Sequence, residues 1–74
     1  MTKEESFVAD IVKLMADERK RQGLSYEKLA GKAGIHRTTI SLIERGKQNP
    51  TLSLCKKLAD SLDLKLSDLI KKCE

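Results

Sequence analysis

The residues best suited to chemistry lie in one short stretch, residues 36–50, which reads HRTTISLIERGKQNP. Arginines and hydroxyl side chains recur there at a spacing that places them on one face of a helix. Arginine can pair bidentately with a guanine edge, hydroxyls can bond bases or phosphates, and an apolar group can contact a thymine methyl. A merely solvated helix would more often use Glu, Lys and Gln, because Thr and Ser are poorer helix formers. This face therefore favours contact with DNA over plain exposure to water.

The helix expected over residues 36–45 has two different faces. Ile40, Ile43 and Glu44 share the inner side. The outer side carries Arg37, Thr38, Ser41, Leu42 and Arg45. An inward carboxylate costs free energy if it is buried without a partner, so Glu44 needs a nearby cation. Arg19, near the end of the first expected helix, is the candidate, and the pair would be structural.

Other kinds of site find little support in the sequence. There is no Ser/His/Asp order, no phosphate-binding glycine loop and no metal cluster, so we expect neither an enzyme nor a cofactor. The single histidine, His36, cannot complete a zinc site. It could titrate beside DNA, and an inert surface histidine is the alternative. Two cysteines, Cys55 and Cys73, favour reduced thiols over a disulfide bridge in so short a chain.

The length and composition of the chain indicate one small domain. Seventy-four residues are near the lower size at which a core can hold itself together. With one Tyr, one Phe and no Trp, that core must be aliphatic. The net charge of +4 is consistent with a polyanionic partner without proving one. No apolar signal segment or transmembrane run is present, which predicts a soluble, cytoplasmic protein.

Helices must position this outer face of residues 36–45. Apolar residues recur at helical spacing along the chain, and no segment alternates as a strand would. The expected helices cover about residues 4–22, 26–33, 36–45 and 52–62, and a shorter one follows Ser67. Inward positions include Phe7, Ile11, Leu14, Met15, Leu29, Ala30, Ala33, Ile40, Ile43, Leu54, Leu58, Ala59, Leu62, Leu66, Leu69 and Ile70. The sequence therefore predicts an all-α fold within a single domain, residues 1–74.

Caps and a tight turn mark a two-helix unit over residues 26–45. Ser25 can accept a hydrogen bond from an exposed backbone N–H at the start of the second helix, and Thr51 or Asn49 can do so for the fourth. Gly34 can adopt a positive φ and turn the chain sharply. Such a helix-turn-helix presents the outer face of its second helix to the major groove. An ordinary helical hairpin is the alternative.

A likeness to a known family rests on residues 25–52, which read SYEKLAGKAGIHRTTISLIERGKQNPTL. This segment resembles the lambda-repressor/Cro-like helix-turn-helix family, also called the XRE family, and the likeness spans about residues 7–72. It is particularly similar to the controller proteins of restriction–modification systems, although many phage and chromosomal regulators share it. The resemblance implies a compact five-helix bundle of prokaryotic or phage origin. Such proteins regulate transcription by binding operator DNA, usually as homodimers on inverted repeats.

The resemblance also implies roles for individual side chains. Those facing base edges would be Arg37, Thr38, Ser41 and Leu42. Those near phosphates would be Tyr26, Thr39, Arg45 and Lys47. Arg19 and Glu44 match the ion pair that is characteristic of the family.

Three departures from the family pattern qualify these roles. Tyr26 stands where the family usually has Gln, so a phenolic hydroxyl would have to make that phosphate contact. His36 stands where a capping Ser, Thr or Asp is common, which predicts a weaker cap for the third helix. Leu42 offers no polar group at a position that is often used for base readout.

Two questions of assembly stay open at the level of sequence. Leucines and an isoleucine near the C-terminus can form a self-complementary dimer patch or simply close the monomer core; they are Leu64, Leu66, Leu69 and Ile70. The alternative function is an antitoxin-type protein-interaction module that also binds DNA. Neutralising a toxin often needs an extra segment, and none is visible beyond residue 72.

Overall fold

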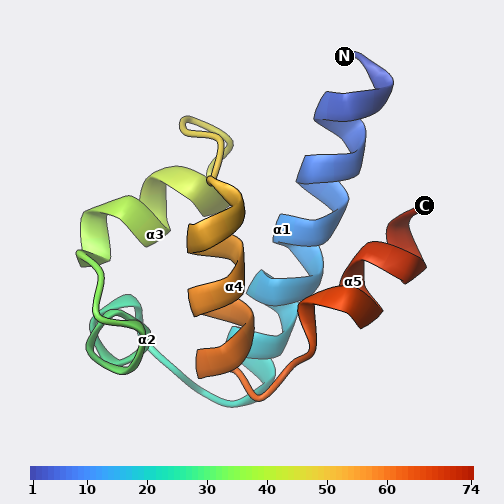
Figure 1. Ribbon diagram of the computed structural model, residues 1–74. Coiled ribbons are helices and arrows are strands. Elements are labelled where there is room, and N and C mark those ends of the chain that lie inside the picture. The colour runs from blue at the N-terminus through green and yellow to red at the C-terminus, as the bar shows by residue number, and fades with distance from the viewer.

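The computed structural model describes all of residues 1–74 and contains five helices joined by short loops (Figure 1). They are α1 (Lys3–Arg21), α2 (Tyr26–Ala33), α3 (Arg37–Glu44), α4 (Leu52–Ser61) and α5 (Leu66–Cys73). There is no strand, so the expected all-α class is confirmed. The first four helices lie where the apolar spacing placed them, to within one residue at either end.

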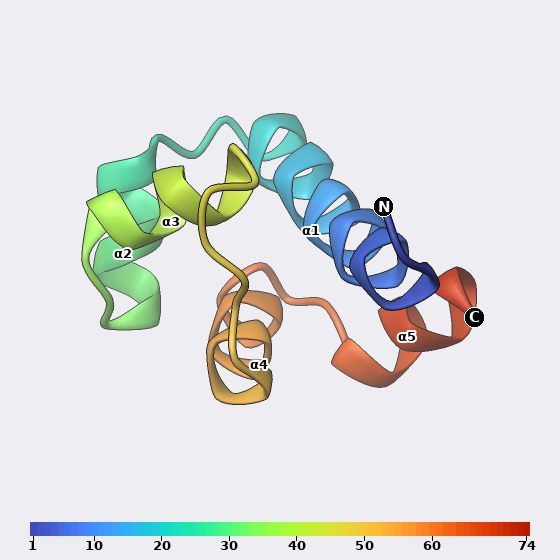
Figure 2. The same cartoon turned by 90° about the horizontal axis from the view of Figure 1, so that it is seen from above.

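The helices pack as two groups joined through α4. The pair α2 and α3 forms one side of the molecule, and α1 and α5 run together on the other (Figure 2). Helix α4 packs against both α2 and α5, and α1 also contacts α3. The resulting body measures 31 × 24 × 21 Å. This arrangement supports α3 from behind and leaves its outward face uncovered.

The core is aliphatic, as the near absence of aromatic residues predicts. Every helix contributes to it, and the buried residues are Ile11, Val12, Met15, Leu29, Ala30, Ile40, Ile43, Cys55, Leu58, Ala59, Leu62 and Leu69. Leu29, Ile40 and Leu62 are the largest side chains that are fully enclosed. No charged or polar side chain is buried among them. Removing these apolar surfaces from water is the main force that holds five short helices together.

Side-chain caps fix where the helices begin. Ser25 Oγ accepts from the backbone N–H of Lys28 at 3.1 Å, as expected. At α4 the cap is Thr51 rather than Asn49, with Oγ1 accepting from the N–H of Leu54 at 3.0 Å. His36 also caps its helix, because Nδ1 accepts from the N–H of Thr38 at 3.2 Å.

The C-terminal region differs from the sequence expectation in two respects. Helix α5 begins at Leu66, so Ser67 lies inside its first turn, and the N-cap residue Lys65 makes no side-chain cap bond. The expected helix start after Ser67 was wrong, because the packing of Leu66 against the core favours a helix that already begins at Leu66. Leu69 is only 3% exposed, which removes it from the candidate dimer patch.

The two cysteines lie in different environments. Cys55 is buried, Cys73 is half-buried, and both thiols are free. No group of three or more His, Cys, Asp or Glu side chains lies close enough together to hold a metal ion. None of the helices is long and apolar enough to cross a membrane.

Candidate nucleic-acid interface

The face of α3 that points away from the core carries the polar groups singled out in the sequence. Ile40 and Ile43 are 1% and 3% exposed and hold the helix against its neighbours. On the opposite side lie the four candidate base-reading residues, of which Arg37 and Thr38 are exposed and Ser41 and Leu42 half-buried. The structure therefore places these four residues on one surface of α3. The two buried isoleucines on the other side fix the orientation of this helix.

A tight turn sets the angle between α2 and α3. Gly34 ends α2 with φ of 69°, a left-handed conformation that glycine adopts without steric cost. Its N–H donates to Ala30 O at 2.8 Å, and the N–H of Ile35 donates to the same carbonyl at 3.2 Å. Ala30 is 7% exposed, and its small side chain lets the two helices approach closely. The turn of three residues between the helices is typical of a helix-turn-helix.

The Arg19–Glu44 pair ties the end of α3 to the end of α1. Arg19 Nε donates to Glu44 Oε2 at 2.7 Å and Nη2 to Oε1 at 3.0 Å, with both side chains 12% exposed. Arg19 Nη1 also donates to the carbonyl of Leu24 at 2.7 Å. Hydrogen bonding to Glu44 raises the pKa of the Arg19 guanidinium, so Arg19 keeps its positive charge. Glu44 thus has the cationic partner that its inward position requires.

Tyr26 extends this cluster to the start of α2. Its ring lies beneath the Arg19 guanidinium, with the centroid 4.6 Å from Cζ, a separation suited to a cation–π contact. Arg19 is therefore engaged along its edges by Glu44 and Leu24 and across its face by Tyr26. The aromatic ring of Tyr26 is thus held in a defined place at the N-terminus of α2.

The other candidate phosphate residues lie around the outward face of α3. Arg45 and Lys47 are exposed and Thr39 is half-buried. The Arg45 guanidinium bends back, with Nε donating to Ser41 O at 3.4 Å. The backbone N–H of Lys47 donates to Leu42 O at 2.8 Å, which anchors the loop at the end of α3. These groups place positive charge and hydroxyls at the edges of the surface that α3 presents.

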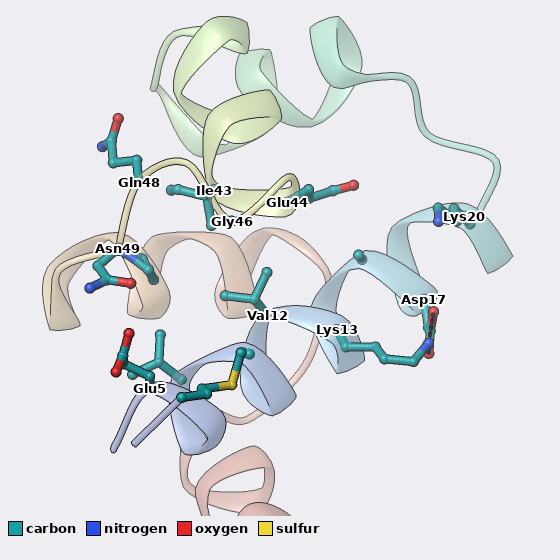
Figure 3. Close-up of a pocket in the computed structure, with 15 residues that line it drawn as sticks. Glu5, Val12, Lys13, Asp17, Lys20, Ile43, Glu44, Gly46, Gln48 and Asn49 are labelled. Carbon is teal, nitrogen blue, oxygen red and sulfur yellow. Dashed lines mark hydrogen bonds and ion pairs between the residues drawn. The ribbon is translucent and has the colours of Figure 1, made fainter. Parts of the chain in front are cut away.

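A pocket of about 350 Å³ lies elsewhere, between α1 and the loop that follows α3 (Figure 3). Val12 and Ile43 form part of its apolar floor. Two of its carboxylates already have local partners, since Asp17 pairs with Lys13 at 3.2 Å and Glu5 accepts from the N–H of Thr2 at 3.1 Å. The pocket therefore offers a mixed polar and apolar surface whose carboxylates Asp17 and Glu5 are already engaged.

Comparison with known proteins now places the chain. A family model described as helix-turn-helix matches residues 15–69, which is more than half of the chain. The chain belongs to the XRE-type helix-turn-helix family. It is 41% identical over 51 residues to an HTH-type transcriptional regulator of Archaeoglobus fulgidus, covering 69% of this chain and 73% of that protein. An HTH-type transcriptional regulator of Methanocaldococcus jannaschii, MJ0272, is also 41% identical over 51 residues, covering 69% and 77%.

Another relative is named for a specific role. The control protein C.BamHI of Bacillus amyloliquefaciens is 40% identical over 50 residues, which cover 68% of this chain and 62% of that protein. The XRE-type family comprises DNA-binding transcriptional regulators and not enzymes. The surface of α3, rather than the pocket beside α1, is therefore the candidate functional site.

One residue at this surface escaped the sequence reasoning. Glu27, in the first turn of α2, accepts from Arg37 Nη1 at 2.7 Å. The two residues are ten positions apart on different helices, so helical spacing gave no hint of the contact. The only available signal was the tight turn itself, which brings the N-terminal turns of α2 and α3 together. Arg37, one of the candidate base-reading residues, is thus held by a carboxylate.

Proposed function

We propose that this protein is a sequence-specific transcriptional regulator that binds operator DNA as a homodimer through α3. The observation that carries the proposal is the division of α3 into two faces. Ile40 and Ile43 fix the helix in the core, while Arg37, Thr38 and Ser41 turn donors and acceptors outward. Side chains of these types suit the edges of bases in a major groove. Membership of a family of DNA-binding regulators supports the same conclusion.

Within this proposal the side chains divide between reading and anchoring. Arg37 pairs with a guanine edge, Thr38 and Ser41 bond bases, and Leu42 packs against a thymine methyl group. Contacts with phosphates come from Tyr26, Thr39, Arg45 and Lys47. Phosphate contacts set the register and much of the affinity, while base contacts supply selectivity. Arg19 and Glu44 take no part in binding and hold α3 at the angle it needs.

The homodimer in this proposal uses an apolar surface that α4 and α5 leave uncovered. Leu52 is 73% exposed at the start of α4, which is unusual for a leucine. It borders a groove with Leu64, Leu66 and Ile70, all half-buried. Leu52 therefore replaces Leu69 in the proposed dimer surface. In a dimer formed through this surface, two α3 helices would lie in successive major grooves, about 34–36 Å apart.

The biological role that we propose is control of a restriction–modification operon, by similarity to the control protein C.BamHI. Regulation of this kind takes place in the cytoplasm of a prokaryote. The neighbouring genes provide a simple check. A methyltransferase and an endonuclease beside this gene support the role, and a small toxin gene in their place contradicts it.

Selection of bound sequences from random DNA at a stated salt concentration tests the proposal. We expect a two-fold symmetric motif whose half-sites lie about one helical turn apart. A motif without symmetry would contradict the homodimer, and no enriched motif at all would overturn sequence-specific binding.

A further inference from the structure

One ion pair joins the N-terminal turns of the two helices that form the DNA-facing surface. Arg37 Nη1 donates to Glu27 Oε1 at 2.7 Å, and the two side chains are 63% and 65% exposed. Solvent screens a pair as exposed as this one, so it contributes little to stability. The main effect of the contact is therefore on the position of the Arg37 side chain rather than on the free energy of unfolding.

The position of Glu27 works against simple affinity for DNA. It follows Tyr26, one of the proposed phosphate contacts, and phosphates repel a carboxylate beside them. A neutral or basic residue at position 27 would raise the affinity for DNA of any sequence. Selectivity between DNA sequences instead increases when a group makes the complex with the wrong sequence unfavourable. Glu27 suits selectivity rather than affinity.

The geometry of the pair leaves Arg37 able to read a base. A guanidinium carries five N–H donors in a rigid fork, and Glu27 takes only one of them, on Nη1. The remaining donors suffice for a bidentate contact with O6 and N7 of guanine. At the same time the carboxylate restrains the guanidinium from turning toward a phosphate.

We infer that Glu27 is a positioning residue that makes Arg37 selective for its base. It holds one side of the guanidinium while the other meets the guanine edge, and it keeps Arg37 off the phosphates of unrelated DNA. The inference rests on the proposed function, because it requires α3 to face DNA. Glu27 sets the ratio between specific and non-specific binding without touching a base itself.

The test measures dissociation constants for the selected site and for a random duplex of equal length over a series of salt concentrations. In Glu27→Ala, Arg37 becomes free to bind a phosphate, so binding to random DNA should tighten and its salt slope should steepen by about 1. The ratio of specific to non-specific affinity should fall about tenfold, within the range of one bidentate base contact. Glu27→Gln keeps an acceptor without the charge and should fall between wild type and Glu27→Ala.

Two controls separate this role from a general effect of charge. Asp17→Ala removes a carboxylate from another exposed pair, with Lys13, and should leave the affinity ratio unchanged. In an Arg37→Ala background, Glu27→Ala should no longer alter the ratio, because the residue through which it acts is gone. Equal changes in both backgrounds would show plain repulsion and overturn the inference, as would an unchanged ratio in Glu27→Ala.

The outcomes also distinguish this inference from the proposed function. If the wild-type protein enriches no motif, the proposed function fails. If it enriches a motif that Arg37→Ala loses, and Glu27→Ala leaves the affinity ratio intact, only the role of Glu27 fails.

Discussion

At the scale of single residues, Arg37 and Lys47 should differ in how they contribute to binding. Arg37→Ala should weaken the selected site by about 1–3 kcal/mol, because a bidentate base contact is lost. Lys47→Ala should instead weaken all DNA similarly and reduce the salt slope by about 1, because one phosphate contact is lost. Titrations of both variants on the selected site and on random DNA check this contrast. Equal losses on the two DNAs for Arg37→Ala would refute its base-reading role.

The Arg19–Glu44 pair should matter to stability far more than the exposed ion pairs do. Glu44→Ala leaves the Arg19 guanidinium, 12% exposed, without its carboxylate partner. We expect the free energy of unfolding to fall by about 3 kcal/mol, since breaking an enclosed pair strands a charge. Urea unfolding of Glu44→Ala measures the loss. Asp17→Ala, whose pair is exposed, should change stability by less than about 1 kcal/mol, and a similar loss in both variants would contradict the distinction.

Glu18 should make stability depend on pH at the junction of α1 and α4. Hydrogen bonds from Arg21 and then from Gln22 lower its pKa from 4.5 to about 2, and Gln22 Nε2 also donates to Leu62 O at 2.9 Å. Because the folded state favours the carboxylate, this stabilisation is fully present above pH 4.5 and is lost as the pH falls to about 2. Glu18→Gln should be less stable than wild type at neutral pH, and the two should converge in acid.

Unfolding free energies of both proteins across the acid range provide the measurement. Arg21→Ala removes the largest cause of the shift in pKa and should lose part of the same pH dependence. A constant difference between wild type and Glu18→Gln at every pH would exclude this carboxylate as the source.

At the scale of elements, α5 is the helix whose start is least well secured. Lys65 occupies the N-cap position with φ of −90° and ψ of 121°, which suits a capping side chain, but its own side chain makes no cap bond. Lys65→Ser should stabilise the protein by about 0.5–1 kcal/mol relative to Lys65→Ala, because the introduced hydroxyl can accept from a free backbone N–H in the first turn of α5. Thermal or urea unfolding of both variants gives the difference. In Thr51→Ala, the matched loss at α4 should be about 1 kcal/mol.

The sequence predicted the elements well because local chemistry determines most of them. Ser25 and Thr51 are residues with strong capping chemistry, and the helices after them start as expected. Lys65 carries no such signal, and the start of α5 instead follows from the packing of Leu66 against the core.

Contacts between distant residues were predictable only where a charge demanded a partner. Glu44 faces inward and needs a cation, which pointed to Arg19. Glu27 sits on an exposed turn where nothing demands a partner, so its contact with Arg37 follows only from the angle between the helices. The burial of Leu69 depends likewise on how α5 packs as a whole.

At the scale of the whole molecule, the central question is what covers the apolar surface formed by Leu52, Leu64, Leu66 and Ile70. Leu52→Glu is the sharpest probe, because Leu52 is 73% exposed in the single chain and its replacement should leave the fold intact. If two copies meet there, a carboxylate from each copy enters an apolar contact, where the loss of its hydration costs free energy and separates the copies. Sedimentation should then report the mass of one 8.3 kDa chain rather than two, with an unchanged circular dichroism spectrum.

DNA binding should reflect the same loss of assembly. Leu52→Glu should bind a single half-site as well as the wild-type protein does and an inverted repeat far more weakly, because the two reading helices are no longer linked. Ser6→Glu adds the same charge at an exposed position on α1, away from this surface, and should remain dimeric. A Leu52→Glu protein that still forms dimers would place the interface elsewhere. A wild-type protein that is monomeric both free and on the inverted repeat would contradict the homodimer itself, and α3 would then read one half-site alone.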